Sequence, residues 1–570
     1  MGNFIKTQNV FSCGEISSEF YAINNSKGVS KLENMDVLQS GGICRRKGLK
    51  SIGNISTNAI LVPFAISESE KYLLVFHNLS MDIYRNDVKI DTKPAPWTAD
   101  DLPKLQYAQR FNSIFFVHPN YQPRILTKTA NGFNISSFTF AANSDMSLNM
   151  PFMQFDDAKN VSITITNSDI DNNHAVFTTN VDFWNNNAIG ERLLVNGKQW
   201  VIESIQNAKV AIVYTNGNFT IPVNPIYDWY ESVFNNRRGW PCCVSFHQNR
   251  LIFGCTAFAP NNIWMSKVGD YNNFDVGSGL DDEAIYITLL SAQHHQICTI
   301  VSSDNLQILT SVGEWDISSS PLTPSNVNIK QHTSVGSIDN KFLPPQQVEG
   351  STIFISKSEK DIRELDLDTL NQKYNATDLC VFSKHLMNNP QSIAYNQNTH
   401  QLFVVMGDGK MAVLNKYINT DISAWASYTT KGEFKYVSVL DDSTYVIVKR
   451  GNNLYLEKFD ESCLVDATNN DFEYKISAMP LIVNGHIPKK IRVRKIIARI
   501  KDTKTLFVNG ERMEIPDYVY SDDSNGFSGD LSMNLLGTEK NTMNPLWMLS
   551  STEQLPATIL SVSVEGWYEI

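Results

Sequence analysis

The residues of this sequence best suited to metal chemistry lie close together, in the segment GWPCCVSFHQNRLIFGCTAFAPNNIWMSKVGDYNNF at 239–274. It contains Cys242, Cys243, His247 and Cys255. Thiolate and imidazole groups are the ligands that zinc and similar ions prefer. Successive side chains of a strand point to opposite faces, so the adjacent Cys242 and Cys243 cannot both reach one ion. We therefore expect no metal here, and interpret the cysteines as core residues and His247 as a turn residue.

Carboxylate groups offer hydrolytic chemistry or calcium binding. The acidic runs at 281–283 and 441–442 have the surroundings of solvated turns. A loop around Gly526 resembles a calcium loop, but Ser521 and Ser532 stand where the first and last acidic ligands belong. There is no nucleophile motif, Walker loop or dinucleotide fingerprint. We expect no catalytic residues, no metal and no cofactor.

One run of basic residues, at 489–504, stands out in a chain whose net charge is −11. If this run is a strand, Lys490, Arg492 and Arg494 share one face. That face is either a solvated or inter-subunit surface, or a channel surface that contacts nucleic acid weakly. The acidic chain as a whole is unsuited to gripping nucleic acid, because phosphate binding needs clustered Lys and Arg.

Length and composition bound the remaining possibilities. A chain of 570 residues is too long for one core, so two to four domains are expected. No stretch approaches the roughly 20 apolar residues of a membrane span, and we expect neither a signal peptide nor a membrane anchor. The 8 cysteines form no C-x-x-C pair, which indicates free thiols and synthesis in the cytosol.

The elements that position these residues are short alternating segments bounded by Asn, Asp and Gly, with almost no helical periodicity. Units of four such segments recur through the chain, at 58–93, 104–140, 240–266, 297–330, 342–368, 391–428 and 433–460. Repeats of this kind predict a mainly β chain built as a β-propeller of six to eight blades. Unrelated β-meanders in two or three sandwiches are the alternative.

The four-strand repeats are interrupted, and the interruptions indicate where one domain ends and the next begins. An inserted small β-barrel or sandwich is expected within the propeller, and a separate β-domain after it. The predicted parts are an N-terminal docking segment at 1–55, the first part of the propeller at 56–144, the insert at 145–236, the second part of the propeller at 237–470 and the C-terminal β-domain at 471–570.

Several motifs in this order resemble those of one family, the tail nozzle proteins of short-tailed bacteriophages, also called tail tubular protein B. The motifs are CGEISSEFY, LENMDVLQSGGICRRKG, QRFNSIFFVHPNYQPRIL, the segment from Trp240 to Phe274, and VGEWDISSSPLTPSNVNIKQHTSVGS. The Cys-Cys after Pro241 and the part after about residue 475 depart from the family pattern.

The resemblance implies a structural protein of the virion tail with no enzymatic activity, assembled in the host cytoplasm. It implies a six-fold homohexameric tube that binds the adaptor ring of the head-to-tail connector and surrounds the DNA during retention and ejection, and it leaves direct attachment of tail fibres open. Candidate docking residues are Gly14, Glu15, Arg45, Arg46 and Lys47. The blade framework comprises Trp240, Pro241, His247, Arg250, Trp264, Gly269, Asp270 and Tyr271.

A different class of function remains as the alternative: a propeller that binds or hydrolyses carbohydrate, like a tailspike receptor-binding protein. Sialidase-type Asp boxes do not recur through the repeats, and the Arg-Arg-x-Gly motif near the N-terminus suits docking to a protein ring. Both features favour the structural tail protein.

Overall fold

The computed structural model of the chain is built almost entirely of β-strands. It describes residues 2–21, 26–168, 170–217, 219–368, 370, 373–467, 470–483, 486–515, 526–535, 539–540 and 544–570. The helices among these residues are short 3-10 turns: η1 (Ser18–Phe20), η2 (Leu102–Lys104), η3 (Asn186–Ala188), η4 (Lys384–Leu386) and η5 (Ile418–Thr420). None of the helices in this described part is long and apolar enough to span a membrane.

The chain divides into two compact units, of which one covers residues 100–342. This unit contains three antiparallel sheets of four sequential strands. They are β12 (Gln106–Arg110), β13 (Ser113–His118), β14 (Tyr121–Thr129) and β15 (Gly132–Ser137); β23 (Cys243–His247), β24 (Arg250–Gly254), β25 (Asn262–Met265) and β26 (Ile285–Thr288); and β27 (Ile297–Ser302), β28 (Leu306–Thr310), β29 (Gly313–Ile317) and β30 (Ile329–Thr333). The first strands of the three sheets, β12, β23 and β27, pack side by side in this order.

The other unit, residues 1–99 and 343–570, contains four further sets of four strands. They are β31 (Gln346–Val348), β32 (Ser351–Ile355), β33 (Ile362–Asp368) and β34 (Lys373–Asp378); β35 (Pro390–Asn396), β36 (Gln401–Met406), β37 (Met411–Tyr417) and β38 (Ile422–Tyr428); β39 (Glu433–Leu440), β40 (Ser443–Arg450) and β41 (Asn453–Asp460) with β7 (Gly48–Ile55); and β8 (Ile60–Ser67), β9 (Glu70–His77), β10 (Ser80–Arg85) and β11 (Val88–Pro94). Here too the first strands of the four sets pack side by side, in the order β31, β35, β39 and β8.

The prediction of a mainly β chain made of propeller blades is therefore confirmed, and the described residues contain seven sets of four strands, three in one unit and four in the other. Local sequence explains the tight blade turns. Gln248 and Asn249 join β23 to β24 with φ of 43° and 58°, as a two-residue type I′ hairpin requires. Strand β7, which precedes β8 in the chain, completes the sheet begun by β39, β40 and β41.

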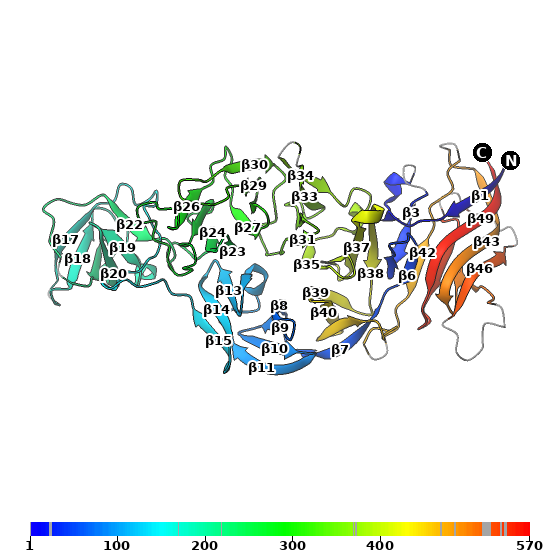
Figure 1. Ribbon diagram of the computed structural model, residues 1–570, viewed down its shortest axis with the longest axis horizontal. Coiled ribbons are helices and arrows are strands. Elements are labelled where there is room, and N and C mark those ends of the chain that lie inside the picture. The colour runs from blue at the N-terminus through cyan, green and yellow to red at the C-terminus, as the bar shows by residue number, and fades with distance from the viewer. Residues whose placement is uncertain are drawn as a thin grey trace. The chain divides into compact units, whose positions relative to one another are not determined.

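Within the range predicted for the insert, residues 152–232 form one seven-stranded sheet (cyan in Figure 1). Its strands are β16 (Phe152–Met153), β17 (Ile163–Asn167), β18 (His174–Thr179), β19 (Arg192–Val195), β20 (Lys198–Asn207), β21 (Val210–Tyr214) and β22 (Trp229–Ser232). The buried Trp184, Trp200 and Trp229 belong to its core. The insert therefore has a hydrophobic core of its own.

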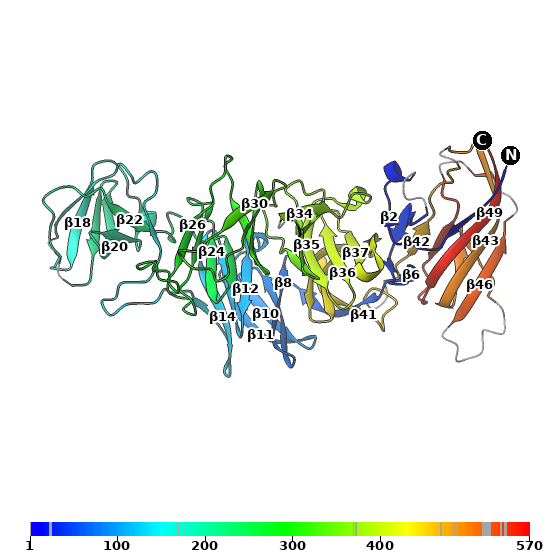
Figure 2. The ribbon, with the colours of Figure 1, turned by 45° about the horizontal axis from the view of Figure 1, so that its top comes forward.

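The C-terminal β-domain contains strands from both ends of the chain, and Figure 2 shows β43 and β49 side by side with the two termini nearby. Its sheet comprises β1 (Gly2–Gln8), β5 (Met35–Val37), β6 (Ile43–Arg45), β43 (Lys490–Thr503), β46 (Phe527–Asn534), β47 (Glu539–Lys540) and β49 (Thr558–Glu569). Strand β1 pairs with β49 along its whole length.

The N-terminal residues 1–55 contribute strands to three different sheets, and their docking role stays a prediction. Their remaining short strands, β2 (Gly14–Glu15), β3 (Gly28–Val29) and β4 (Lys31–Glu33), extend the sheet of β38 toward the C-terminal domain. Strands β42 (Tyr474–Ser477), β48 (Met548–Ser551), β44 (Phe507–Val508) and β45 (Glu511–Arg512) follow β4 in that sheet. The N-terminal segment thus joins the last blades to the C-terminal domain within one unit.

Candidate functional site

The basic run predicted from the sequence lies on β43, a strand of 14 residues. Lys490, Arg492 and Arg494 are exposed, whereas Ile491 and Val493 between them are buried in the core of the C-terminal domain. A strand alternates its side chains between two faces, so the three cations share the outer face of the sheet.

The neighbouring strand β49 contributes an aromatic and an acidic side chain to this face. Trp567 lies directly opposite Arg492, and the guanidinium carbon is 5.4 Å from the centroid of its ring. Glu569 lies opposite Lys490. A guanidinium over an aromatic ring keeps its charge and its outward N–H donors while its flat surface is covered. The outer face of the sheet therefore carries the guanidinium group of Arg492, positioned by the ring of Trp567.

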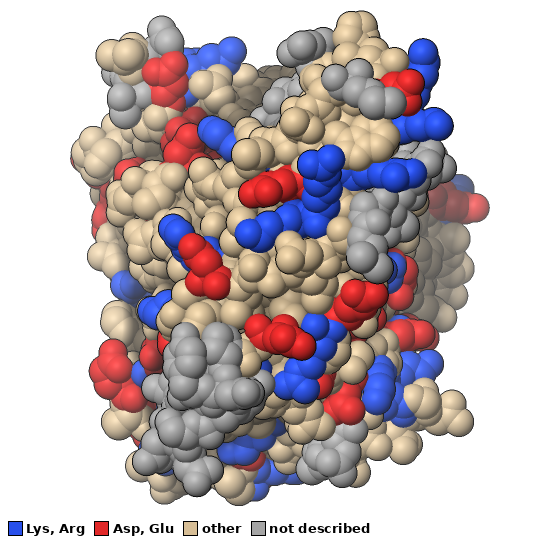
Figure 3. All heavy atoms as spheres, turned by 90° about the vertical axis from the view of Figure 1, so that its right-hand side faces the viewer, with Lys and Arg blue, Asp and Glu red and all other residues tan. Residues whose placement is uncertain are grey.

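Farther along β43 the positive charge is balanced. Arg499 donates from Nε and Nη2 to the two carboxylate oxygens of Asp530 on β46, at 2.7 and 2.9 Å. The exposed cations Lys490, Arg492 and Arg494 lie at the beginning of the strand. Figure 3 looks from the side on which β43 and β49 lie in Figure 1, and Lys and Arg side chains gather in its upper central part beside single acidic side chains.

The candidate docking residues have a different environment, because four of the five are buried in the chain. Arg46 pairs with Asp466, and neither side chain is exposed. Arg45 donates to the carbonyl oxygens of Leu555 and Phe472 at 3.0 and 3.1 Å. These guanidinium groups bind the N-terminal segment to the C-terminal part and are not offered on a surface.

Glu15 and Gly14 are interior for similar reasons. Glu15 accepts hydrogen bonds from His385 Nε2 at 3.0 Å and from the backbone N–H of Leu32 at 2.9 Å. Burial by itself raises the pKa of Glu15, but the hydrogen bond from His385 and the charge of Lys31 outweigh it, so the pKa is lowered. Gly14 has φ of +61°, and a Cβ there would lie 2.3 Å from the carbonyl oxygen of Trp425.

Lys47 is the one docking candidate whose side chain reaches solvent. Its Nζ lies 2.6 Å from Glu461, and its side chain is 39% exposed. The adaptor-binding role of the other four stays a prediction that their burial does not favour, since a partner would have to reach them through the chain's own interior contacts.

The blade framework serves a structural purpose in the sheet of β23–β26. Arg250 is completely buried and donates to the carbonyl oxygens of Ser266, Asp281 and Glu283 at 2.8, 2.8 and 2.5 Å. It thereby links the end of β25 to the residues before β26, and the connection between them contains Gly269, whose φ is +74°. The sequence motif identified Arg250 as a framework residue. The structure shows the carbonyl oxygens to which its buried guanidinium group donates.

The other framework residues also make contacts within the unit. Trp264 belongs to the aromatic core, with Trp240 and Tyr271 packed against that core. His247 Nδ1 lies 2.9 Å from the Ser302 hydroxyl, and burial lowers the pKa of His247. Asp270 accepts from the backbone N–H of Asn272 at 3.2 Å. Pro241 precedes the blade's first strand and is buried.

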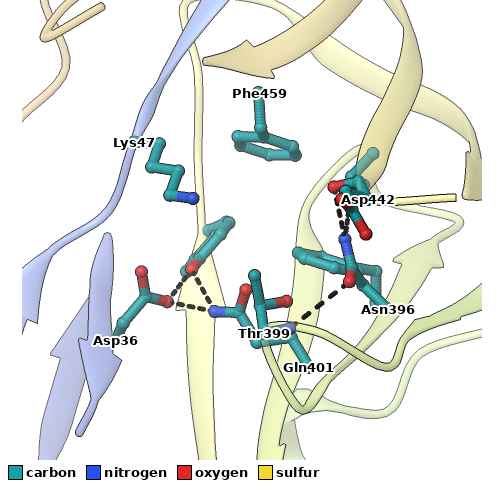
Figure 4. A pocket seen from close by; sticks show the side chains of 10 residues that line it. Asp36, Lys47, Asn396, Thr399, Gln401, Asp442 and Phe459 are labelled. Carbon is teal, nitrogen blue, oxygen red and sulfur yellow. Dashed lines mark hydrogen bonds between the residues drawn. The ribbon is translucent and has the colours of Figure 1, made fainter. Parts of the chain in front are cut away.

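A small cavity between blade strands and the N-terminal segment is lined by Asp36, Lys47, Gln401 and Asp442 among others (Figure 4). Asp36 accepts hydrogen bonds from Gln401 Nε2 at 2.7 Å and from the Tyr428 hydroxyl. Burial raises the pKa of Asp36. The cavity has a volume of about 30 Å³, enough for one or two water molecules. It is too small for a ligand. Its polar side chains connect the N-terminal segment to the blade strands through hydrogen bonds.

Cys242 and Cys243, at the start of the sheet β23–β26, lie in different environments, as strand alternation predicted. Cys243 lies in the hydrophobic core, whereas Cys242 lines a larger cavity of about 230 Å³ together with Cys255 and Cys298. Among the described residues, no three His, Cys, Asp or Glu side chains are placed to hold a metal ion. Residues 521–525 of the calcium-like loop lie outside the described part of the chain.

Sequence reasoning missed the partners that decide these environments. Asp466 and Phe472 surround Arg46, Trp567 lies beside Arg492, and Cys298 lines the same cavity as Cys242. Only Trp567 had a local signal, as an aromatic residue among polar ones in the terminal alternating segment.

Comparison with protein families identifies the central part of the chain. Residues 243–485 match the family model described as bacteriophage nozzle protein. This part, less than half of the chain, is therefore similar to the phage nozzle proteins. The resemblance seen in the sequence is thus confirmed, and the match supports a structural protein of a phage tail. The candidate docking residues and the basic strand both lie outside the nozzle-family region.

Known proteins and structures add little to this match. No curated protein matches the chain. BamB from Moraxella catarrhalis has a TM-score of 0.34 at 10% identity and covers 71% of this chain and 96% of its own. Hsv2 from Kluyveromyces lactis has a TM-score of 0.29 at 12% identity and covers 65% of this chain and 98% of its own. Similarity this low carries no functional argument.

Proposed function

We propose that this chain forms the nozzle of a short-tailed phage: a six-fold homohexameric tube that binds the adaptor ring and lines the path along which DNA is held and ejected. The observation that carries the proposal is the nozzle-family match over residues 243–485. Assembly in the host cytoplasm and the absence of catalytic activity are parts of the same proposal.

The distribution of charge supports a conduit. A channel must let a polyanion slide, and strong phosphate binding along the wall would hold it back. The net charge of −11 with a short basic face at Lys490, Arg492 and Arg494 suits that purpose. We place this face at the channel, where its cations contact phosphate groups briefly.

Adaptor binding is assigned to the surface of the N-terminal segment rather than to its arginines. Arg45 and Arg46 hold the segment in place from within, and Lys47 with Glu461 lies at its surface. On this proposal the arginines shape the docking surface and the adaptor contacts exposed side chains around Lys47.

Native mass measurement and electron microscopy of the purified full chain, alone and with its adaptor protein, test the proposal. We expect rings of six copies with an axial hole, formed or stabilised by the adaptor. A chain that stays monomeric with its adaptor and instead binds or cleaves a bacterial polysaccharide would overturn the nozzle and support the tailspike-like alternative.

A further inference from the structure

Two cysteine side chains meet at the edge of the sheet formed by β23 and β24. The last pair of that ladder is Cys243 with Gly254, so Cys242 and Cys255 occupy the next opposed positions. The backbone N–H of Cys242 donates to the carbonyl oxygen of Cys255 at 2.9 Å, which holds the two backbones together. Directly opposed residues of an antiparallel pair have the Cα separation that a disulfide needs.

The side chains of the pair line the same cavity, and the Cys255 sulfur lies 3.9 Å from the carbonyl oxygen of Thr256. Cys255 has φ of +58° at the end of β24, and both cysteines line the cavity of about 230 Å³. Both thiols therefore lie on the same side of the sheet.

The two thiols differ in access and acidity. Cys242 is partly exposed in the cavity, whereas Cys255 is 4% exposed. Interaction with the Cys255 thiol, with a further contribution from the Lys104 ammonium, lowers the pKa of Cys242, although burial opposes this. The same interaction, with burial, raises the pKa of Cys255. Thiolate character and access together favour oxidation at Cys242.

We propose that Cys242 and Cys255 form a peroxide-sensitive thiol pair, in which Cys242 is oxidised first and Cys255 closes a reversible disulfide across the strands. The Cys242 thiolate attacks one oxygen of hydrogen peroxide, the O–O bond breaks, and sulfenic acid and hydroxide form. The Cys255 thiol then attacks the sulfenic sulfur, the S–O bond breaks, and the hydroxyl group leaves as water with the proton of the thiol. In total two thiols and one peroxide give one disulfide and two waters.

The other cysteines near the cavity have different contacts. Cys298 directs its sulfur to the carbonyl oxygens of Gln296 and Ser337, both at 3.7 Å. Cys243 directs its sulfur to the carbonyl oxygen of Ile297 at 3.6 Å and is not among the residues that line the cavity. The neighbouring ladder positions, the backbone hydrogen bond and the shared cavity therefore select Cys255 as the partner of Cys242. This inference does not depend on the proposed function.

Thiol counting and peptide mapping of the full chain test the pair. The reduced protein is treated with hydrogen peroxide, its remaining thiols are alkylated after denaturation, and a parallel sample is reduced again with dithiothreitol. We expect alkylation of the 8 cysteines to fall by two and to recover on reduction. An unchanged count, or a loss that dithiothreitol does not reverse, would overturn the proposal.

The sequence makes the mapping unambiguous. Trypsin cleaves after Arg238, Arg250, Lys267 and Lys330, so Cys242, Cys255 and Cys298 fall in three different peptides. We expect a cross-link between the peptides 239–250 and 251–267 that persists in Cys243→Ser. A cross-link to the peptide of Cys298 instead would contradict the pairing.

Two variants separate the roles of the thiols. Cys255→Ser removes the resolving thiol, so a sulfenic acid at Cys242 should persist and react with dimedone. Cys242→Ser should give no such adduct at Cys255, and the matched control Cys298→Ser should keep the native cross-link. A dimedone adduct at Cys255 in Cys242→Ser would reverse the assignment. The mapping of the native chain decides the pairing even if a variant fails to fold.

Discussion

Arg46 and Asp466 form a two-pronged ion pair in the interior of the protein, although 420 positions separate them in the chain. The two terminal guanidinium nitrogens donate to the two carboxylate oxygens at 2.9 and 2.7 Å. The guanidinium carbon also lies 3.6 Å from the centroid of the Phe472 ring, and Nε donates to the Asn34 side chain at 2.8 Å. This cluster fastens the N-terminal segment to the region that follows the last blade.

Removing the charge of Asp466 should destabilise the protein strongly. Asp466→Asn keeps the shape but leaves the Arg46 cation buried without its counter-ion, which typically costs about 3–5 kcal/mol. We expect the free energy of unfolding of the unit that contains both termini to fall by this amount. Urea denaturation, monitored by tryptophan fluorescence, measures this loss as a lower urea concentration at the midpoint of the first unfolding transition.

The exposed pair next to it is the matched control. Lys47→Ser breaks the contact with Glu461, whose side chain is 82% exposed. Water and salt screen such a pair, so the change should stay within about 1 kcal/mol. Equal losses in the two variants would contradict the distinction between the buried clasp and the surface pair.

Arg250 gives a second stability prediction, in the nozzle-family region. Arg250→Met keeps the apolar stem and removes the donors for the carbonyl oxygens of Ser266, Asp281 and Glu283. A buried polar group that loses its partner costs about 1–3 kcal/mol, so we expect a loss of about 3 kcal/mol, seen as earlier unfolding of the unit at 100–342. The same change at the half-exposed Arg110 should cost less than about 1 kcal/mol.

The sequence predicted features that depend on neighbouring residues. The outer face of Lys490, Arg492 and Arg494 follows from strand alternation alone, and so does the separation of Cys242 from Cys243. The four-strand units were visible because their turns carry residues such as Asn249 that accept positive φ. These features depend on residues within a few positions of one another.

The environments of Arg45 and Arg46 could not be predicted in this way. Two adjacent arginines after a turn have the sequence pattern of a surface cluster, and they become interior only because Asp466 and Phe472 close over them. Pairing of β1 with β49 joins the two ends of the chain in the same manner. Contacts across more than 400 positions leave no local periodicity.

Glu15 should make stability depend on acidity. Its pKa is lowered in the folded protein, so its ionised form stabilises the fold above the pKa of the unfolded chain, near 4.3, and that contribution disappears as the pH falls through the folded pKa. Glu15→Gln should therefore lower the melting temperature at pH 7, and the difference from the native protein should shrink toward acid pH.

A thermal unfolding series between pH 7 and pH 3 measures this dependence. Glu19→Gln, an exposed substitution of the same type in the N-terminal segment, should match the native protein throughout. A difference for Glu15→Gln that grows as the pH falls would show that burial of the carboxylate outweighs its hydrogen bonds from His385 and Leu32.

The basic face of β43 should govern any contact with DNA. Binding of duplex DNA by the assembled protein is expected to be weak and to decrease with salt, because phosphate contacts release counterions. Changing Arg492 and Arg494 together to Ser should reduce the slope of log affinity against log salt by roughly one unit for each lost phosphate contact. Fluorescence anisotropy of labelled DNA at several salt concentrations measures the slope.

A charge-matched control separates this local effect from a general loss of positive charge. Changing the exposed Lys209 and Lys357 to Ser removes the same two charges elsewhere, and we expect the slope and the assembly to stay as in the native protein. If the Arg492 and Arg494 variant keeps the native slope but no longer assembles, the face that includes Trp567 belongs to a subunit interface. If it assembles and the slope falls, the cations face the DNA, and the acidic remainder of the chain then explains why the contact stays weak.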